Sequence, residues 1–363
     1  MIYWLVSARS RGFVGIIAVM TIARANMSLI AEDLYVWLPP RRGWGLANCG
    51  LLVSPRTALW IDTPYDRYLA GEFLAESGKR LPAGVSVDRV VVTHGNGDHF
   101  WGAGVLPDAE VITTRETLEH IHYEPTPQEL HDLVRGSDPG TAIGRYLGRH
   151  FGVFDWAGVE PVQPSTLFRG ELELRVGDHP VQLSSLAPAH TTGDLMVHLP
   201  RQKAVFAGDV IFSSTPEQPG DTPVHWAGPL ANVIEACERV LATGAEIIVP
   251  GHGPVLDRAG VRAHIGYLEY LRERTGELHA AGTPALEAAR RLIAERRQPE
   301  LDLTERLVIT VASEYQHLDG SERPAVLQVM AQVAQVAEEL AQGRLPGAEP
   351  VGASAASAAG LPG

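Results

Sequence analysis

The sequence predicts an α/β fold followed by a separate helical subdomain, and three observations lead to this prediction. Between about residues 34 and 253, short apolar and β-branched runs alternate with helix-like segments, which is typical of α/β proteins. After Gly253 the strand-like runs stop, and four long stretches rich in Ala, Leu, Glu and Arg follow. With 363 residues, 45% of them hydrophobic and 20% charged, the chain can bury a substantial core in one large domain or two.

The first strands are separated by turn-forming residues. Apolar runs at residues 34–38, 46–53 and 58–61 predict three strands, and residues 66–78 then have the pattern of a helix. The uncharged β-branched run within residues 87–93 predicts a buried central strand. The other strands are predicted at residues 111–113, 172–176, 181–186, 195–199, 204–207 and 246–249, and the other helices before Gly253 at 114–123, 126–134 and 230–241.

The two helices predicted at 114–123 and 126–134 belong to an insert that extends to about residue 156. The insert contains four histidines, most of which we expect at the surface or in packing contacts: His120, His122, His131 and His150. Helical inserts between strands often cover a pocket. His122 and Tyr123 are therefore candidate substrate contacts.

The region after Gly253 predicts a helical subdomain that serves packing, lid formation or dimerisation. Its helices are predicted at residues 258–278, 284–295, 303–317 and 323–340, with Gly343 as the C-terminal cap. The Ala/Ser/Gly/Pro-rich end predicts disorder. We thus divide the chain into an N-terminal extension, an α/β domain, a helical subdomain and a tail, at residues 1–26, 27–257, 258–346 and 347–363.

Charge and cysteine content limit the partners and the compartment. The net charge of −13 and the lack of clustered Lys and Arg argue against a nucleic-acid partner. The two cysteines, Cys49 and Cys237, are expected to be buried thiols in a cytoplasmic protein, although one disulfide stays open. Amphipathic C-terminal helices make a homodimer a reasonable expectation.

The first 26 residues allow three interpretations. The apolar segment 13–23 follows Arg9 and Arg11 and precedes Ala23-Arg24-Ala25, a small-x-small form typical of a signal cleavage site. The segment is too short to span a membrane. Arg24 inside the triplet argues against export, and Met27 is an alternative start, so we expect a cytoplasmic protein, with export as the alternative.

The chemistry is indicated by a glycine-containing turn directly after the predicted central strand. This turn presents four polar side chains within six positions: His94, Asn96, Asp98 and His99. Imidazole and carboxylate groups at such spacing, at the end of a strand, are typical of a metal site. Three further candidates, His190, Asp209 and His252, each close or follow a later apolar run.

These residues resemble the motifs of the metallo-β-lactamase superfamily over about residues 34–253. That family has H-x-H-x-D-H, then a single His, an Asp and a late His. This chain has His94-Gly95-Asn96-Gly97-Asp98-His99, followed by His190, Asp209 and His252. The resemblance implies a four-layer αββα sandwich, with the site at one edge where the two sheets meet.

One residue departs from the family pattern, because Asn96 replaces the second histidine of the motif. The resemblance implies that His94 and His190 hold one metal, with Asn96 as a weak third ligand. Asp98, His99 and His252 would hold the other, with Asp209 bridging both. An amide binds metal through its neutral oxygen, a poorer donor to zinc than imidazole. We expect one or two zinc ions, with manganese or iron as alternatives at the first site.

The ligand set predicts a hydrolase. A divalent ion with an open position lowers the pKa of bound water to roughly 7, and Asp98 is suited to orient that water or to take its proton. Asp62 is expected in a turn or holding a ligand histidine. The resemblance implies a small-molecule substrate with an ester-like bond, as in glyoxalase-II-like thioesterases, lactonases and polyketide cyclase/thioesterase enzymes. A mononuclear iron enzyme that uses oxygen and a non-catalytic binding protein are the alternatives.

Overall fold

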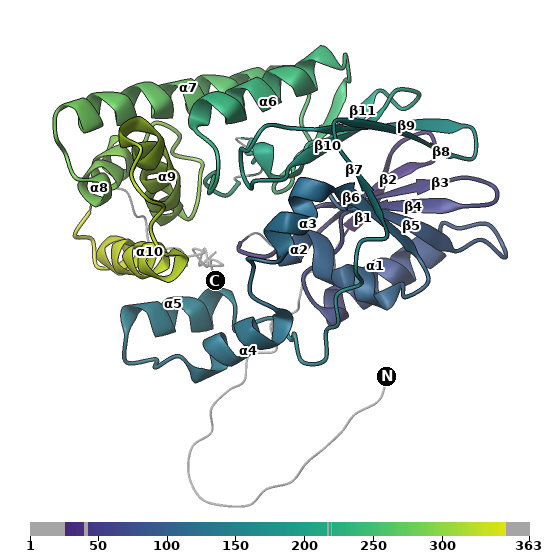
Figure 1. Ribbon diagram of the computed structural model, residues 1–363, viewed down its shortest axis with the longest axis horizontal. Coiled ribbons are helices and arrows are strands. Elements are labelled where there is room, and N and C mark those ends of the chain that lie inside the picture. The colour runs from purple at the N-terminus through teal and green to yellow at the C-terminus, as the bar shows by residue number, and fades with distance from the viewer. Residues whose placement is uncertain (1–25, 40–42, 216–217, 219, 346–363) are drawn as a thin grey trace, which may run out of the picture.

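The computed structural model describes residues 26–39, 43–215, 218 and 220–345. Two β-sheets face each other, helices cover their outer faces, and a group of C-terminal helices lies beyond one end of the sandwich (Figure 1). The predicted four-layer αββα arrangement with C-terminal helices is therefore confirmed.

The larger sheet has seven strands in sequence order. They are β1 Asn26–Ala31, β2 Leu34–Leu38, β3 Cys49–Val53, β4 Ala58–Ile61, β5 Val87–Val91, β6 Glu110–Thr114 and β7 Thr166–Phe168. The first four strands pair antiparallel, and β4 to β7 pair in parallel. The parallel strands point their carboxyl ends to one edge, so the turn after β5 opens there.

The smaller sheet has five strands in the order β12-β11-β10-β9-β8. They are β8 Glu171–Val176, β9 His179–Ser185, β10 Leu195–Leu199, β11 Ala204–Phe206 and β12 Ile247–Val249. Strands β11 and β12 are parallel, and the other pairs are antiparallel. The segments that follow β11 and β12 therefore leave the sheet at the same edge.

Successive side chains of a strand point to opposite faces of the sheet, so one face packs against the other sheet and the opposite face packs against a helix. In β4, Leu59 and Ile61 point between the sheets, where they pack with residues such as Val197 and Phe206 of the smaller sheet. Trp60 points to the other face and stacks on Phe73, with ring centroids 4.3 Å apart. This period of two is what a strand buried on both faces requires.

Helices cover both outer faces. Helix α1 (Arg67–Gly78) begins at Asp66, whose carboxylate accepts a hydrogen bond from the amide of Leu69, and it packs on the larger sheet. Helices α6 (Leu230–Ala242) and α7 (Arg258–Ala280) pack together along the smaller sheet (Figure 1).

An insert between β6 and β7 forms three helices, and one of them meets the C-terminal helices. These elements are α3 Arg115–Ile121, α4 Pro127–Gly136, α5 Ala142–His150, α8 Ala285–Glu295, α9 Leu307–Asp319 and α10 Val326–Ala341. Helix α5 packs against α10 (Figure 1), and Nε of Arg145 donates to Oε1 of Glu338, 2.8 Å away. The insert and the chain end therefore form one cover over the same edge of the sandwich.

Most predicted elements are present, several with different ends. The strand predicted at 46–53 begins only at Cys49, and the helix predicted at 303–317 begins with a 3-10 turn, Thr304–Arg306. Gly343 ends α10 with a φ of +64°, as predicted. Strands β1 and β7 and helix α5 were missed. The predictions for residues 1–25 and 346–363 lie outside the described residues.

The structure also bears on the thiols and on membrane spans. Cys49 and Cys237 are both buried and unpaired, as predicted. Among the described residues, no helix is both long enough and apolar enough to cross a membrane. The domain boundaries and the homodimer stay predictions.

Candidate metal centre

All seven predicted site residues meet at the edge where the two sheets come together. The turn after β5 carries His94 and Asn96, and the short helix α2 (Gly97–Phe100) carries Asp98 and His99. The smaller sheet supplies the rest. His190 lies between β9 and β10, Asp209 lies in the turn Gly208–Val210 after β11, and His252 follows β12.

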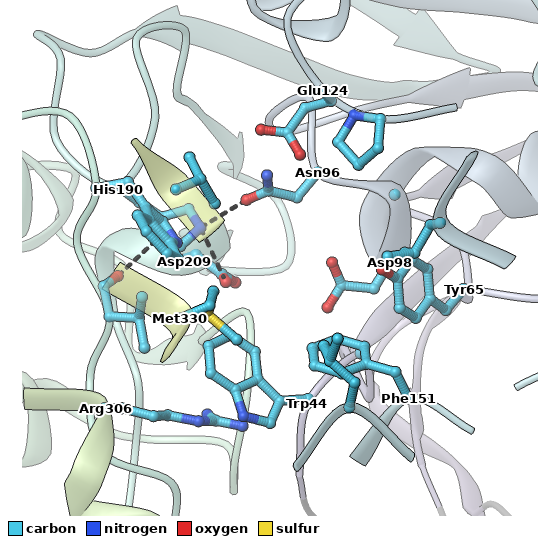
Figure 2. Close-up of a pocket in the computed structure, with 18 of the residues that line it drawn as sticks. Trp44, Tyr65, Asn96, Asp98, Glu124, Phe151, His190, Asp209, Arg306 and Met330 are labelled. Atoms are coloured by element: carbon cyan, nitrogen blue, oxygen red, sulfur yellow. Dashed lines mark hydrogen bonds and ion pairs between the residues drawn. The ribbon is translucent and has the colours of Figure 1, made fainter. Parts of the chain in front are cut away.

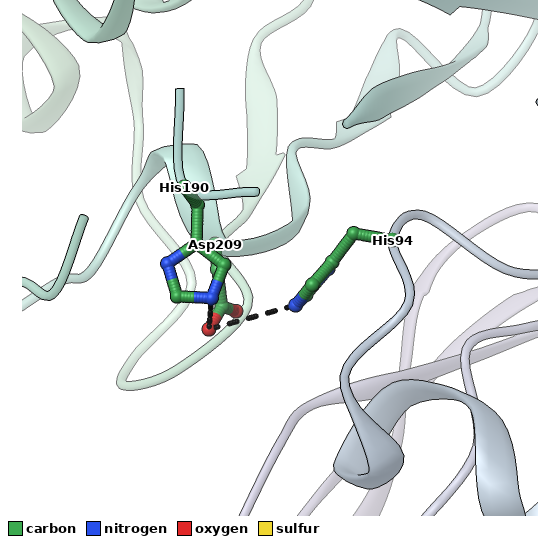
Figure 3. A group of neighbouring side chains, drawn as sticks. All are labelled: His94, His190 and Asp209. Carbon is green, nitrogen blue, oxygen red and sulfur yellow. Dashed lines mark ion pairs between the residues drawn. The ribbon is translucent and has the colours of Figure 1, made fainter. Parts of the chain in front are cut away.

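The first group of candidate ligands is His94, His190 and Asp209, whose ligand atoms lie within 4.8 Å of one another (Figure 3). Nε2 of His94 is 3.9 Å from Oδ2 of Asp209, and Nε2 of His190 is 3.5 Å from the same oxygen. All three side chains are buried. Because the three atoms point at one small volume, a single ion could contact all of them.

The second group is Asp98, His99 and His252, and Asp209 lies beside it too. Nε2 of His252 is 3.5 Å from Oδ2 of Asp98 and 3.3 Å from Oδ2 of Asp209. Nε2 of His99 is 3.1 Å from Oδ1 of Asp209. The Asp209 carboxylate therefore lies between the two groups, in the place that a bridging ligand needs.

The other ring nitrogen of each candidate histidine has a hydrogen-bond acceptor. Nδ1 of His190 lies 2.5 Å from the carbonyl oxygen of Val224, and Nδ1 of His252 lies 3.1 Å from that of Leu46. A carbonyl can only accept, so both Nδ1 atoms carry the hydrogen. In the neutral rings Nε2 then presents a lone pair to the centre, which is the form that binds metal.

Asp62 fixes the same tautomer at His94 and His99. Its Oδ2 lies 2.8 Å from Nδ1 of His99 and accepts a hydrogen bond from the hydroxyl of Thr93, also at 2.8 Å. Since that hydroxyl donates to Asp62, it accepts from Nδ1 of His94, 3.1 Å away. The predicted contact between Asp62 and a candidate ligand histidine is thus present.

Asn96 and His190 bring two atoms close together that both carry lone pairs, the amide oxygen Oδ1 and the ring nitrogen Nε2. Its Oδ1 is 2.7 Å from Nε2 of His190. With the hydrogen of a neutral His190 ring on Nδ1, both atoms present lone pairs and repel each other. A cation between them removes the repulsion. The contact therefore fits Asn96 as a third donor to the first group, through its amide oxygen.

Several atoms of the centre have no hydrogen-bond partner within the described part of the chain. They include Nε2 of His94, Nε2 of His99 and Oδ1 of Asp209, all buried. Burying polar atoms without a partner is costly. These unpaired nitrogen and oxygen donors point to one place, so the residues fit a metal ion.

Burial and charge act against each other at the histidines. Burial alone would lower the pKa of His99, but the carboxylates of Asp209, Asp62 and Asp98 outweigh it and raise that pKa well above its ordinary value. The pKa of His252 is raised to about 9, because Asp209 and Asp98 likewise outweigh burial. Burial and the charge of His99 lower the pKa of His94. Protons on two imidazoles thus balance the carboxylates, a role that a cation can take over.

The turn that holds Asp209 leaves no room for a side chain at Gly208. Gly208 precedes Asp209 and has a φ of +55°, a conformation that glycine adopts without strain. A Cβ built there would lie 2.8 Å from Oγ1 of Thr93 and 3.6 Å from Nδ1 of His94. The glycine lets the Asp209 turn approach the His94 turn closely.

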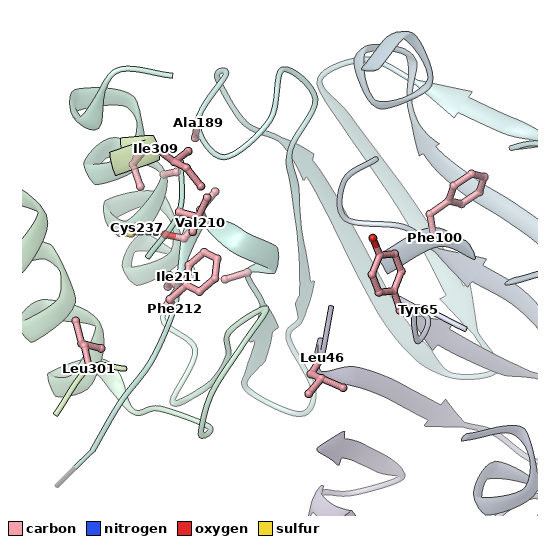
Figure 4. Close-up of a cluster of buried hydrophobic side chains, with 14 of the residues drawn as sticks. Leu46, Tyr65, Phe100, Ala189, Val210, Ile211, Phe212, Cys237, Leu301 and Ile309 are labelled. Carbon is pink, nitrogen blue, oxygen red and sulfur yellow. Dashed lines mark hydrogen bonds between the residues drawn. The ribbon is translucent and has the colours of Figure 1, made fainter. Parts of the chain in front are cut away.

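A cavity of about 210 Å³ opens in front of the centre (Figure 2). Asn96, Asp98, Asp209 and His252 lie in its wall, and most of the remaining wall is apolar. Phe212 is part of this wall and stacks on His252 with ring centroids 5.2 Å apart, and it belongs to a buried cluster that also contains Cys237 (Figure 4). The centre is therefore held rigidly on one side and open to a substrate on the other.

The prediction for the insert named the wrong residues. Tyr123 is 88% exposed and His122 does not line the cavity, whereas their neighbours His120 and Glu124 do. The sequence around His120 gives no signal that this histidine lines a cavity. Trp226 also lines the cavity, and its neighbour His225 is buried.

Asp194 positions His190 and was also missed. Its carboxylate accepts hydrogen bonds from the amides of Ala189 and Thr191 and from the hydroxyl of Thr191. These bonds shape the loop on both sides of His190. A Thr-Thr-Gly-Asp run is typical of such side-chain-to-backbone turns and was the available signal.

Comparison with known proteins decides the family. The model of the metallo-beta-lactamase superfamily matches residues 42–252. The chain belongs to the metallo-β-lactamase superfamily. Members of this superfamily are mostly hydrolases and typically bind metal ions. This chain has the metallo-β-lactamase fold and two groups of His and Asp residues that could hold a metal ion.

Individual relatives are distant. The acyl-coenzyme A thioesterase MBLAC2 of Gallus gallus is 25% identical over 219 residues, 57% of this chain and 72% of that protein. The beta-lactamase-like protein 2 homolog of Caenorhabditis elegans is 22% identical over 192 residues, 53% of this chain and 50% of that protein. A metallo-beta-lactamase from Pontibacter korlensis, of known structure, has a TM-score of 0.49 at 17% identity, covering 68% of this chain and 99% of that one.

Proposed function

We propose that this protein is a metal-dependent hydrolase of an ester-like bond, with an acyl thioester as its foremost substrate. One observation carries the proposal: Asp209 lies between two groups of inward-pointing donors, several of which line a mostly apolar cavity. The similarity to an acyl-coenzyme A thioesterase supports the thioester over a lactone or another ester.

The proposed ligand sets follow the two groups. His94, His190 and Asn96 would hold one ion, and Asp98, His99 and His252 the other, with Asp209 shared. The second set has two imidazoles and a carboxylate and suits zinc. The amide oxygen in the first set lowers its preference for zinc and favours an ion that accepts oxygen ligands, such as manganese or iron.

The side chains of this centre have defined tasks during hydrolysis. A bound divalent ion supplies hydroxide at neutral pH and polarises the carbonyl that is attacked. Burial would raise the pKa of Asp98, but His99 and His252 outweigh it and keep that pKa below its ordinary value. Asp98 is therefore a carboxylate at neutral pH, and it can orient the attacking water and accept its proton. The cavity's apolar wall excludes competing water.

A panel of acyl thioesters and lactones tests this proposal. We expect the purified protein to hydrolyse a thioester, and Asp209→Asn and His252→Ala to abolish hydrolysis without changing the far-UV circular dichroism spectrum. Gln328→Ala, on the exposed face of α10, serves as the control and should keep full activity. Full activity in either site variant would refute the proposed centre.

Asn96 favours one further candidate. An oxygen donor beside two imidazoles and a carboxylate is also compatible with iron, and hence with an iron enzyme that uses oxygen. Such an enzyme would contain stoichiometric iron and consume oxygen with its substrate. A hydrolase consumes none, so an oxygen electrode separates the two.

A further inference from the structure

We infer that the cavity in front of the candidate metal centre is an acyl-chain chamber, and that helix α10 and the insert helices α4 and α5 set its chain-length specificity. This inference rests on the proposed function. It assigns an apolar acyl chain to a part of the cavity that lies away from the ligands.

Three helices build the apolar wall of the chamber. Its side chains are Leu130 and Leu133 of α4, Leu147 of α5, and Val326, Leu327 and Met330 of α10. Val326 and Met330 are four residues apart and so lie one above the other on a single face of α10. The wall thus extends at least one helical turn, about 5 Å, away from the centre.

Part of this wall is not covered by any of the residues that the structure describes. Val326 is 50% exposed and Leu327 is 58% exposed, while Met330, deeper in the same wall, is 7% exposed. An apolar chain that enters here would remove this surface from water, which is favourable. A polar leaving group would lose its hydration against the same residues, which is unfavourable.

The cavity wall also contains one buried cation, Arg306. Arg306 is 1% exposed, and its guanidinium lies 4.1 Å over the ring of Trp44 and 3.5 Å from a carboxylate oxygen of Asp221. Its Nε and Nη2 are buried without partners among the described residues. Figure 2 shows Arg306 beside Trp44. The ring of Trp44 and the carboxylate of Asp221 thus face this charge, and Trp44 contributes an aromatic surface to the cavity wall.

The orientation of the substrate follows from the continuity of the cavity. The candidate ligands Asp98 and Asp209 line the same cavity as Leu327 and Met330. A carbonyl at the centre therefore has its attached chain within reach of α10. Glu124 and Arg323 line the same cavity and are polar, and they suit the hydrated leaving group.

Helix α10 lies beyond residue 252, where the family match ends. The chamber is therefore built in part by a segment that the superfamily motifs do not describe. Its specificity belongs to this chain and is not transferred from the relatives.

The test compares acetyl and decanoyl thioesters of one thiol as substrates of the purified full-length protein. Each methylene buried in the chamber should raise kcat/KM by about fourfold, so decanoyl should exceed acetyl by more than about a hundredfold. Met330→Trp fills the chamber and should lower the decanoyl value about tenfold or more. Gln328→Trp adds the same bulk on the exposed face of α10 and should change neither substrate.

A second variant changes an exposed residue and leaves the packed interior unaltered. Leu327→Glu places a charge at the exposed end of the wall and should weaken decanoyl hydrolysis about fivefold while sparing acetyl. Equal kcat/KM for acetyl and decanoyl, or no difference between these variants and Gln328→Trp, would overturn the inference while leaving the proposed function intact.

Binding of free decanoate, measured by calorimetry, decides the inference without catalysis. Wild-type protein should bind decanoate and not acetate, and Leu327→Glu should bind decanoate more weakly. If no thioester is hydrolysed, the proposed function fails, yet this binding pattern would still support the chamber. Absence of decanoate binding would overturn the chamber.

Discussion

The carboxylate of Asp62 lies 2.8 Å from Nδ1 of His99 and also accepts hydrogen bonds from the amide and the hydroxyl of Thr93. Through Thr93 it reaches Nδ1 of His94. Asp62 is not itself a candidate ligand. It thereby orients two histidines that are, one in each group.

Asp62→Asn should weaken metal binding about 10- to 100-fold, the range found when a partner of a ligand histidine is lost. The amide keeps the shape but loses the charge that holds the proton on Nδ1 of His99. Asp62 has a φ of +58°, a conformation that Asn also tolerates, so the backbone should stay in place. Competition titration with a chelating dye measures the affinity. An unchanged affinity would contradict the role assigned to Asp62.

Asn96→His should raise zinc occupancy of the first group. The change restores a third imidazole, a better donor to zinc than an amide oxygen. The Asn96 side chain makes no capping hydrogen bond to α2, so its replacement should not disturb that helix. We expect wild-type protein to keep about one zinc per chain through dialysis and the variant to approach two. Two tightly held zinc ions in wild-type protein would contradict the weak first site.

Gly251→Ala should disable the centre while the core stays folded. A Cβ at this position would overlap Oδ1 of Asp209 and approach the carbonyl carbon of Gly208. Asp209 would then be displaced from both groups, and thioester hydrolysis should fall by more than about a hundredfold. Gly266→Ala in α7 is the matched control, because its Cβ meets nothing within 4 Å. It should keep activity and be slightly more stable. Equal activity in both variants would count against the assigned position of Asp209.

Removal of metal should destabilise the fold. The carboxylates of Asp98, which is half-buried, and Asp209, which is buried, face the centre, and the buried Asp62 lies behind His99. A bound cation would partly balance their charge. A ligand at 100 times its Kd contributes about 2.7 kcal/mol, so a chelator should lower Tm by roughly 5–10 °C. Added zinc should restore it. A Tm that is the same with and without chelator would argue that no ion is held there.

The sequence predicted the parts of this protein that local patterns specify. Uninterrupted apolar runs that break at glycine or aspartate predicted the strand at residues 58–61. The same pattern predicted candidate ligands at the ends of the neighbouring strands. Asp62 was foreseen beside a ligand histidine because it ends such a strand. His94 and His252, more than 150 residues apart, were brought together by the resemblance to a family, since spacing along the chain says nothing about such a contact.

The cavity could not be predicted, because it depends on contacts between distant helices. Leu147 and Met330 have the helical spacing of ordinary core residues, and only the packing of α5 against α10 makes them line a cavity. The short helix α5 contains two glycines, Gly144 and Gly148, which have low helix propensity, and its stability comes from tertiary packing.

The central claim is that the seven candidate residues between His94 and His252 hold a metal ion. Elemental analysis of the full-length protein, purified without added metal, tests it most directly. We predict at least about one zinc, manganese or iron ion per chain, and its loss in a variant that combines Asp209→Asn with His252→Ala. Wild-type protein that contains no stoichiometric metal, and binds none when zinc, manganese or iron is supplied, would contradict the claim.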